Sequence, residues 1–316
     1  MKMKIVFFGT TDFAVASLDA LMKTEHEVVG VVTNINKLGG RGRKEVIRSA
    51  VCQYALQNDL TLLQPATLKG PRFLARLAAL EADLFVVVAF RMLPEVVWSM
   101  PEKGTINVHG SLLPAYRGAA PINWAIINGE KETGVSVFFL DQKIDTGKIL
   151  LYKKMPVSQD DTFGSLYEAL KELGGEALQE AVSLISRGHY SLVPQNDAVA
   201  SHAPKLDRSN TRIDFDQTPE QIVNLCRGLD PYPGAWFEWE KSLIKVWKAG
   251  ISDEKLPAGY WSCDYKTWWS IGCGNGSVNI LELQPEGKKR MTIKEFLNGF
   301  GSKMRSKFEN GQNRIE

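Results

Sequence analysis

Residues 105–121 constrain the fold most strongly, because they place two polar side chains at the end of a short strand. Between Thr105 and His109 the residues alternate as in a β-strand, so Asn107 and His109 project from the same face. Gly110 then breaks the strand and opens a loop. Loops at strand ends carry much of the chemistry of α/β proteins. The stretch therefore predicts an α/β fold with an amide and an imidazole side by side at a strand end.

The N-terminal third has the pattern of a parallel sheet. Apolar runs at residues 4–8 and 27–33 flank a helical pattern that begins near Thr11 or Asp12, and this strand, helix, strand order implies parallel strands. Only Gly9 stands in the first turn, so the Gly-x-Gly-x-x-Gly pattern of a dinucleotide site is missing. Further helices are expected at residues 45–57, 72–80 and 121–128, and further strands at residues 61–63, 83–89, 134–140 and 149–155.

The second half of the chain changes character. A long amphipathic helix at residues 162–186 is expected to close the first domain. Periodicity is then lost, and a short helix at 219–228 precedes several strand-like runs separated by turn signals, as in a small barrel. These strands are expected at residues 235–239, 243–249, 267–272 and 277–282. The sequence thus predicts a Rossmann-like, mostly parallel domain at 1–188, a linker at 189–206 and a smaller β domain at 207–316.

Composition limits the class of protein. The 316 residues are 44% hydrophobic and 23% charged, and the formal net charge is only +2, so any nucleic-acid binding must come from a local patch. No apolar stretch has the length of a membrane span, and the apolar run near the N-terminus is too short for a signal peptide. The four cysteines form no Cys-x-x-Cys pair, so we expect structural thiols, no metal site and a cytoplasmic location.

Two motifs together resemble a known family. The run N-x-H-G-S-L-L-P-x-x-R-G-A-A-P-I begins at Asn107, and D-x-x-x-D-T-G follows at residues 141–147. In this combination the chain resembles the 10-formyltetrahydrofolate-dependent formyltransferases. The resemblance implies that Asn107, His109 and Asp145 are catalytic and that 10-formyltetrahydrofolate is the formyl donor. It further implies an OB-like barrel at the C-terminus, where Pro-Tyr-Pro-Gly-Ala-Trp and Gln-Pro-Glu-Gly-Lys-Lys match the family.

The resemblance also implies a folate site beside the catalytic residues. The folate ring is expected to lie against the backbone of the loop after the strand at 83–89 and against the Ser-Leu-Leu-Pro loop. The residues concerned are Phe90, Arg91, Met92, Ser111, Leu112, Leu113 and Pro114. Many family members have Tyr-Gly where this chain has Phe90-Arg91, which changes the local backbone but leaves carbonyl and amide contacts possible.

The three residues suit formyl transfer to an amine, which passes through a tetrahedral intermediate with a developing oxyanion. Asn107 donates through its amide, and a protonated His109 donates a charge-assisted bond; each such donor lowers the barrier by about 3–4 kcal/mol. Asp145 is expected to fix the histidine ring and to organise a water that takes the amine proton. Ser111 lies outside any Gly-x-Ser-x-Gly turn and is not expected to be a nucleophile. Without the surrounding motif, a lone strand histidine would more often be structural.

A basic loop points to the acceptor substrate. Glycines and cations are interspersed at residues 39–44, a composition more typical of a solvated loop than of a flexible arm that binds phosphates. Family members that act on initiator methionyl-tRNA carry Gly-Arg-Gly-(Lys or Arg)-Lys here, although they usually flank it with prolines that this chain lacks. The predicted tRNA contacts are Arg41, Gly42, Arg43 and Lys44, with Lys288, Lys289 and Arg290 in the C-terminal domain. Most tryptophans of that domain are expected to be structural.

Three functions stay open from the sequence. Formylation of initiator methionyl-tRNA by a monomeric enzyme is favoured. A sugar-nucleotide N-formyltransferase would share the catalytic residues but would be expected to lack the basic loop and the Gln-Pro-Glu-Gly-Lys-Lys segment. A non-catalytic RNA-binding protein would not need Asn107, His109 and Asp145 together.

Overall fold

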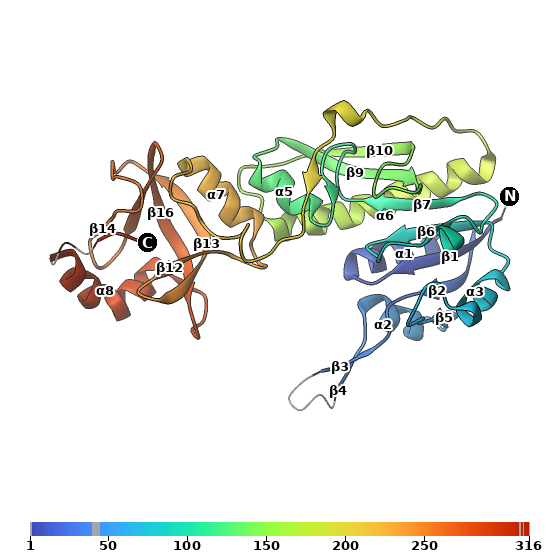
Figure 1. Ribbon diagram of the computed structural model, residues 1–316, viewed down its shortest axis with the longest axis horizontal. Helices are drawn as coiled ribbons and strands as arrows, with labels where there is room; N and C mark the ends of the chain where they lie inside the picture. Colours follow the sequence, from blue (N-terminus) through green and yellow to red (C-terminus); the bar gives the residue numbers. More distant parts are fainter. Residues whose placement is uncertain (1, 40–44, 310, 312, 316) are drawn as a thin grey trace. The chain divides into compact units, whose positions relative to one another are not determined.

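The computed structural model describes residues 2–39, 45–309, 311 and 313–315. The chain divides into two compact units. Figure 1 shows their elements, coloured by position in the sequence. Unit 1 consists of Met1–Pro121, Glu132–Pro156 and Tyr167–Ala203. Unit 2 consists of Ile122–Lys131, Val157–Leu166 and Pro204–Glu316. The segment expected as a linker is therefore part of unit 1 as far as Ala203.

A seven-stranded sheet organises unit 1, in the order β10-β9-β7-β6-β1-β2-β5. The neighbouring strands β7, β6, β1, β2 and β5 are parallel, whereas β9 runs antiparallel to both β7 and β10. The strands are β1 (Lys4–Gly9), β2 (Glu27–Val32), β5 (Leu62–Leu63), β6 (Leu84–Val88), β7 (Thr105–His109), β9 (Glu132–Phe139) and β10 (Ile149–Pro156). Every residue of β6 is buried, as its continuous apolar sequence requires. The expectation of a mostly parallel, Rossmann-like sheet is confirmed.

Helices cover this sheet (Figure 1). They are α1 (Asp12–Met22), α2 (Ala50–Gln57), α3 (Pro71–Ala78), α4 (Glu95–Trp98) and most of α6 (Phe163–Arg187). The first turn of α6 belongs to unit 2, as does α5 (Pro121–Ile127) from its second residue onward. Glycines let α6 approach closely: a Cβ at Gly174 would lie 3.3 Å from Phe13 and 3.5 Å from Val108, and one at Gly175 would lie 3.1 Å from Ala20. The helix predicted at 162–186 is thus found within one residue at each end.

The prediction of a helix at residues 45–57 is partly wrong. Its first residues form a short hairpin, in which β4 (Glu45–Ile47) pairs antiparallel with β3 (Lys37–Gly39), inside the region expected as a loop. β-branched Val46 and Ile47 favour a strand. The helix α2 begins only after Ser49, whose hydroxyl accepts from the backbone N–H of Cys52 at 3.0 Å. Residues 40–44, which follow β3 in the sequence and precede β4, lie outside the described residues.

The N-terminal strand is attached to a buried histidine. His26 is 9% exposed, and its Nδ1 accepts a hydrogen bond from the backbone N–H of Met3 at 3.2 Å. A ring nitrogen can accept a hydrogen bond only when it carries no proton, so this bond favours the neutral imidazole. Burial also favours the neutral form, because it lowers the pKa of His26.

Stability is therefore expected to fall in mild acid. Because the folded-state pKa of His26 is lowered, the unfolded chain binds a proton first as the pH falls through about 6.5, and this favours unfolding. Between about pH 7.5 and pH 5.5 the free energy of unfolding should drop more in the wild type than in His26→Asn. Asparagine keeps an acceptor but cannot titrate. Denaturant unfolding at both pH values measures the difference, and equal pH dependence in the two proteins would contradict it.

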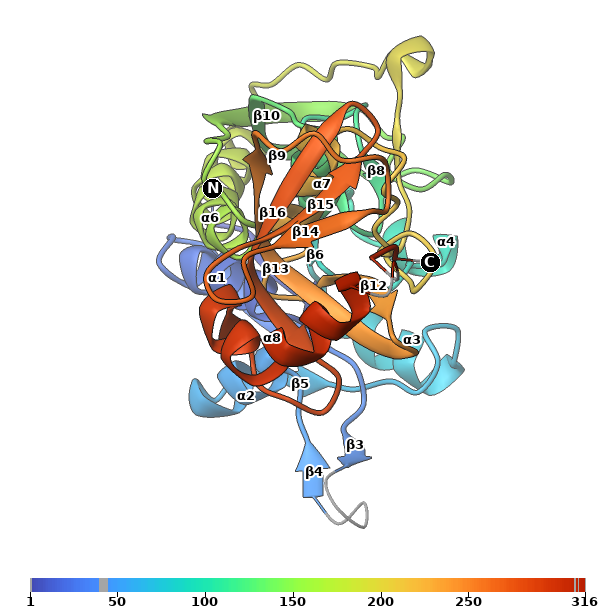
Figure 2. The same ribbon diagram turned by 90° about the vertical axis from the view of Figure 1, so that its left-hand side faces the viewer.

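Unit 2 is built on an antiparallel sheet in the order β12-β13-β16-β15-β14, with β17 paired to β16. Figure 2 shows β13 and β16 side by side in the middle of this sheet. The elements are α7 (Pro219–Gly228), β12 (Ala235–Trp239), β13 (Ser242–Ser252), β14 (Trp261–Cys263), β15 (Trp269–Cys273), β16 (Gly276–Pro285), β17 (Met291–Thr292) and α8 (Ile293–Glu309). The helix α8 was not anticipated from the sequence.

Aromatic side chains fill the core of unit 2. Trp261, Trp269, Phe237 and Phe296 are buried, and the rings of Trp269 and Phe296 stack at 5.6 Å. The tryptophans at 239, 247, 261 and 269 are buried in this way, whereas Trp236 stays half-exposed. All four cysteines are buried free thiols, in agreement with a structural role. Across the described ranges, no helix has both the length and the apolar character needed to span a bilayer.

Candidate active site

The strand β7 carries the first two candidate residues. It pairs with β6 on one side and with β9 on the other, so it lies inside the sheet and is rigidly held. His109 is buried and Asn107 is half-buried, on the same face of the strand as the alternation predicts. Within the described part of the chain, the side chain of Asn107 makes no hydrogen bond. Its amide group is thus available to a ligand.

The imidazole of His109 is oriented by a backbone carbonyl. Its Nε2 lies 2.9 Å from the carbonyl oxygen of Tyr116. Since a carbonyl oxygen only accepts, Nε2 must carry a proton. The other nitrogen, Nδ1, lies 3.8 Å from Oδ2 of Asp145. Nδ1 is therefore the ring nitrogen that faces the Asp145 carboxylate.

Asp145 reaches His109 from the loop between β9 and β10. It has a φ of 56°, in the left-handed region, and its Oδ2 accepts from the backbone N–H of Gly118 at 2.9 Å. Gly118 itself has a φ of 127°, and a Cβ there would lie 2.6 Å from the carbonyl oxygen of Ala203. A residue with a side chain would be strained at this position. Glycine therefore allows the backbone conformation in which the N–H of Gly118 meets the Asp145 carboxylate.

The Ser-Leu-Leu-Pro loop is held by side chains beneath it. Ser111 is fully buried and donates through Oγ to the carbonyl of Ala115 at 2.7 Å. Ser136 bridges the loop from β9, because its hydroxyl donates to the carbonyl of Ser111 at 2.6 Å and accepts from the N–H of Leu113 at 2.9 Å. The hydroxyl of Ser111 therefore serves the loop and is not exposed as a nucleophile. Leu112 and Pro114 are half-buried at the loop surface.

The second expected folate segment follows the neighbouring strand. Because β6 and β7 are parallel, with Val88 opposite Val108, residues 90–92 and the Ser-Leu-Leu-Pro loop leave the sheet at the same edge. Arg91 donates to the carbonyl of Pro65 at 2.7 Å and lies over the ring of Phe90 at 5.6 Å. Met92 is 68% exposed. The structure brings the two segments to one edge, next to the catalytic candidates.

Four residues near this site had no assigned role from the sequence. Tyr116 and Arg117 stood inside the recognised motif, so their position could have pointed to them. Gln195 and Ser201 lie in the aperiodic stretch expected as a linker, where no pattern singles them out. Gln195 donates to the carbonyls of Asp145 and Gly147 at 2.9 and 2.8 Å.

The expected tRNA contacts have different environments. Residues 41–44 lie outside the described residues. Lys288 and Lys289 are exposed. Arg290 is paired with Asp230 and Glu282 at 2.7 Å each, and it lies over the ring of Trp247 at 5.3 Å. Its charge is thus already compensated inside unit 2, which leaves the two lysines as the stronger candidates.

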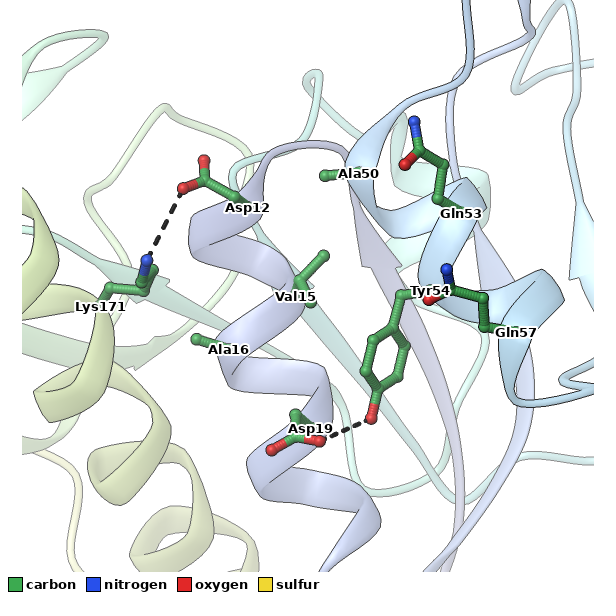
Figure 3. A pocket seen from close by; sticks show the side chains of 9 residues that line it. All are labelled: Asp12, Val15, Ala16, Asp19, Ala50, Gln53, Tyr54, Gln57 and Lys171. Carbon is green, nitrogen blue, oxygen red and sulfur yellow. Dashed lines mark hydrogen bonds and ion pairs between the residues drawn. The ribbon is translucent and has the colours of Figure 1, made fainter.

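A shallow pocket lies elsewhere on unit 1, between α1, α2 and α6 (Figure 3). Its volume is about 390 Å³. Its charged side chains and its tyrosine form pairs: Tyr54 donates to Asp19 at 2.8 Å, and Lys171 lies 3.8 Å from Asp12. Burial and this hydrogen bond raise the pKa of Tyr54 to about 12. None of the catalytic candidates lines the pocket, and its paired groups do not converge on a ligand.

Known proteins resemble this chain over most of its length. A model of the formyl transferase family matches residues 3–182, and a model of the formyl transferase C-terminal domain matches residues 205–301. A protein of Flavobacterium johnsoniae named methionyl-tRNA formyltransferase is 45% identical over 310 residues, which covers 94% of this chain and 96% of the relative. A protein of the same name from Flavobacterium psychrophilum is 47% identical over 306 residues, with the same coverage.

Solved structures share the fold. The sugar 3N-formyl transferase WlaRD, solved with dTDP and 5-N-formyl-THF, has a TM-score of 0.66 at 21% identity and covers 92% of this chain and 100% of its own. HypX from Aquifex aeolicus, in complex with tetrahydrofolic acid, has a TM-score of 0.63 at 20% identity and covers 95% of this chain and 48% of its own. The two family models and the near-full-length relatives lead to one conclusion: the chain belongs to the formyl transferase family.

Proposed function

We propose that the protein transfers a formyl group from 10-formyltetrahydrofolate to the α-amino group of methionyl initiator tRNA, and so supports the initiation of translation. The observation that carries the proposal is the arrangement of Asn107 and His109 on one face of β7, with Asp145 at 3.8 Å from the imidazole. Relatives that are 41–47% identical over most of the chain bear the name of this activity.

The proposed mechanism is direct attack by the amine. The methionyl nitrogen forms a bond to the formyl carbon, and the bond from that carbon to N10 of the folate then breaks. Asn107 donates to the oxyanion of the tetrahedral intermediate, as does His109 when Nδ1 is protonated. The proton lost by the amine passes to a water held by Asp145, and N10 takes a proton as it leaves. No covalent enzyme intermediate is needed.

The formyl donor is proposed to bind where the loops after β6 and β7 leave the sheet. Backbone amides and carbonyls of residues 90–92 and 111–114 would hold the pterin, because the side chains of Ser111 and Arg91 are already engaged within the protein. Folates accompany two of the proteins that share the fold, which supports this placement.

The tRNA is proposed to bind through phosphate contacts, because the relevant groups are cations. Lys288 and Lys289 are exposed, and Trp236 on the same domain is flanked by Arg208 and Arg212, at 4.8 and 5.8 Å from its ring. The residues 41–44 would supply further positive charge from unit 1. Since this acceptor is an aminoacyl-tRNA, we place the activity in the cytoplasm. A monomer remains the expected state, and sedimentation of the purified protein tests it.

Binding of tRNA is therefore expected to weaken steeply with salt. Replacing Lys288 and Lys289 together by alanine should lower the affinity for tRNA and reduce the slope of log K against log[salt] by roughly one to two. Filter binding between about 50 and 200 mM salt measures both quantities. Glu286→Gln is the matched control, since it changes a neighbouring exposed charge of opposite sign and should not weaken binding. An unchanged slope in the double variant would remove these lysines from the tRNA interface.

The activity itself is tested by identifying the product. The protein is incubated with labelled 10-formyltetrahydrofolate and methionyl initiator tRNA, and the aminoacyl ester is then hydrolysed. The label is expected in N-formylmethionine, and uncharged initiator tRNA should take up none. Label that fails to appear in N-formylmethionine, while the folate still binds, would contradict the proposed acceptor.

A further inference from the structure

Residues 193–203, which we call the strap, are hydrogen-bonded along the loop that follows β7. Arg117 N donates to the carbonyl of Ser201 at 2.9 Å, and Ser201 Oγ accepts from the N–H of Tyr116 at 2.9 Å. A short parallel pair, β8 (Arg117–Gly118) with β11 (His202–Ala203), continues this contact. At its other end the strap bridges to Ile149 of β10. The strap therefore connects the loop after β7 to the strand that follows the Asp145 loop.

Gln195 makes the central connection, and its amide is fully used. Nε2 donates to the carbonyls of Asp145 and Gly147, at 2.9 and 2.8 Å. Oε1 accepts from Nε and one terminal nitrogen of Arg117, at 3.0 and 2.7 Å. Two donors and two acceptors exhaust the hydrogen-bonding capacity of a primary amide. The opposite orientation would set the NH₂ group against a guanidinium that has no acceptor, so the orientation of Gln195 is fixed.

Arg117 makes this orientation rigid. Its side chain is 9% exposed, and besides Gln195 it contacts Asp197, which is 79% exposed and lies 2.7 Å away. An ion pair with so exposed a partner is screened by water. The pair of hydrogen bonds to Gln195 is the sheltered contact. It holds the amide of Gln195 so that its NH₂ group faces the Asp145 loop.

Asp145 needs such support because of its backbone. Its φ of 56° is uncommon for a residue with a side chain and persists only where surrounding contacts hold it. The described contacts are the N–H of Gly118 on its carboxylate and the amide of Gln195 on its own carbonyl and on that of Gly147. These contacts together set where the carboxylate lies relative to Nδ1 of His109.

We propose that Gln195 and Arg117 are positioning residues for formyl transfer, which act by holding the Asp145 carboxylate opposite His109. This inference rests on the proposed role of Asp145. Neither residue is expected to touch the substrates, so their loss should lower kcat and leave the KM values for folate and tRNA nearly unchanged.

The test is a double-variant cycle on kcat. Gln195→Glu keeps the size of the side chain but replaces the donor by an oxygen that faces two carbonyls, and it should lower kcat by about tenfold or more. In an Asp145→Asn background the same change should cost no more than about twofold, because the two residues act as one unit. The pH profile of kcat should also shift in Gln195→Glu. Gln57→Glu, the same change at an exposed position of α2, is the control and should keep the kcat of the wild type.

The outcomes separate the two ideas. Equal losses from Gln195→Glu in both backgrounds, or an unchanged kcat in the single variant, would overturn the positioning role. A wild-type kcat in Asp145→Asn would instead overturn the proposed role of Asp145 itself. Thermal melting checks that the variants fold. If Gln195→Glu does not fold, Gln195→Ala removes the donor without adding charge, and the same cycle is run with it.

Discussion

Replacing Asn107 by alanine is expected to lower the rate constant of formyl transfer by at least about a hundredfold, because one oxyanion donor typically contributes this much. The expected loss falls on the chemical step, since the oxyanion is absent from the bound substrates and develops only on the way to the tetrahedral intermediate. In the described chain the Asn107 side chain has no hydrogen-bond partner, so its removal leaves no group unsatisfied. The melting temperature should therefore stay close to that of the wild type.

Single-turnover measurements with saturating folate and methionyl-tRNA isolate this step. Gln57→Ala is the matched control, because it removes an exposed amide from α2, away from the site. It should transfer the formyl group at the wild-type rate. A loss of less than about tenfold in a well-folded Asn107→Ala variant would mean that the amide is not the oxyanion donor.

Replacing Gly147 by alanine is expected to damage both the fold and the activity. A Cβ at this position would lie 1.7 Å from the carbonyl oxygen of Phe139, a backbone atom that cannot turn aside. The loop must therefore move, although the carbonyl of Gly147 is held by Gln195 and its neighbour is Thr146, next to Asp145. We expect a loss of stability of about 2–4 kcal/mol. Displacement of the carboxylate should also lower kcat by about a hundredfold.

Thermal denaturation and kcat, measured on the same preparation, check this prediction. Gly299→Ala is the control: it lies in α8, and beyond its chain neighbours and the adjacent helix backbone an added Cβ would meet nothing within 4 Å. Alanine favours the helix there, so stability should stay equal or rise slightly. Wild-type stability and kcat in Gly147→Ala would show that the loop has room that the structure does not display.

Much of the fold could be predicted because local pattern decided it. The buried strand β6 is apolar throughout, and the helix α6 repeats its leucines at helical spacing over 25 residues. The relation between Asn107 and His109 follows from alternation along a single strand, so it required no knowledge of other elements. Asp145 follows the strand expected at residues 134–140 and can reach His109 if that strand lies beside β7; the pairing of β9 with β7 meets this condition.

The remaining features depend on contacts between distant residues. Gln195 lies 50 positions from Asp145, in a stretch whose prolines and polar residues look like a linker. Its role arises only when the strap pairs with the loop after β7. The hairpin of β3 and β4 was missed for a different reason: Glu45 to Gln57 contains enough helix-forming residues to hide the start signal at Ser49.

The acceptor substrate tests the account most directly. Initial rates are measured with labelled 10-formyltetrahydrofolate and, in parallel, with methionyl initiator tRNA and with a dTDP-linked amino sugar as acceptor. We predict that kcat/KM for the charged tRNA exceeds that for the amino sugar by at least about a thousandfold, since a site built for one acceptor leaves polar groups unpaired with another. Faster transfer to the amino sugar, or none to the tRNA while the folate is bound, would contradict the proposed function.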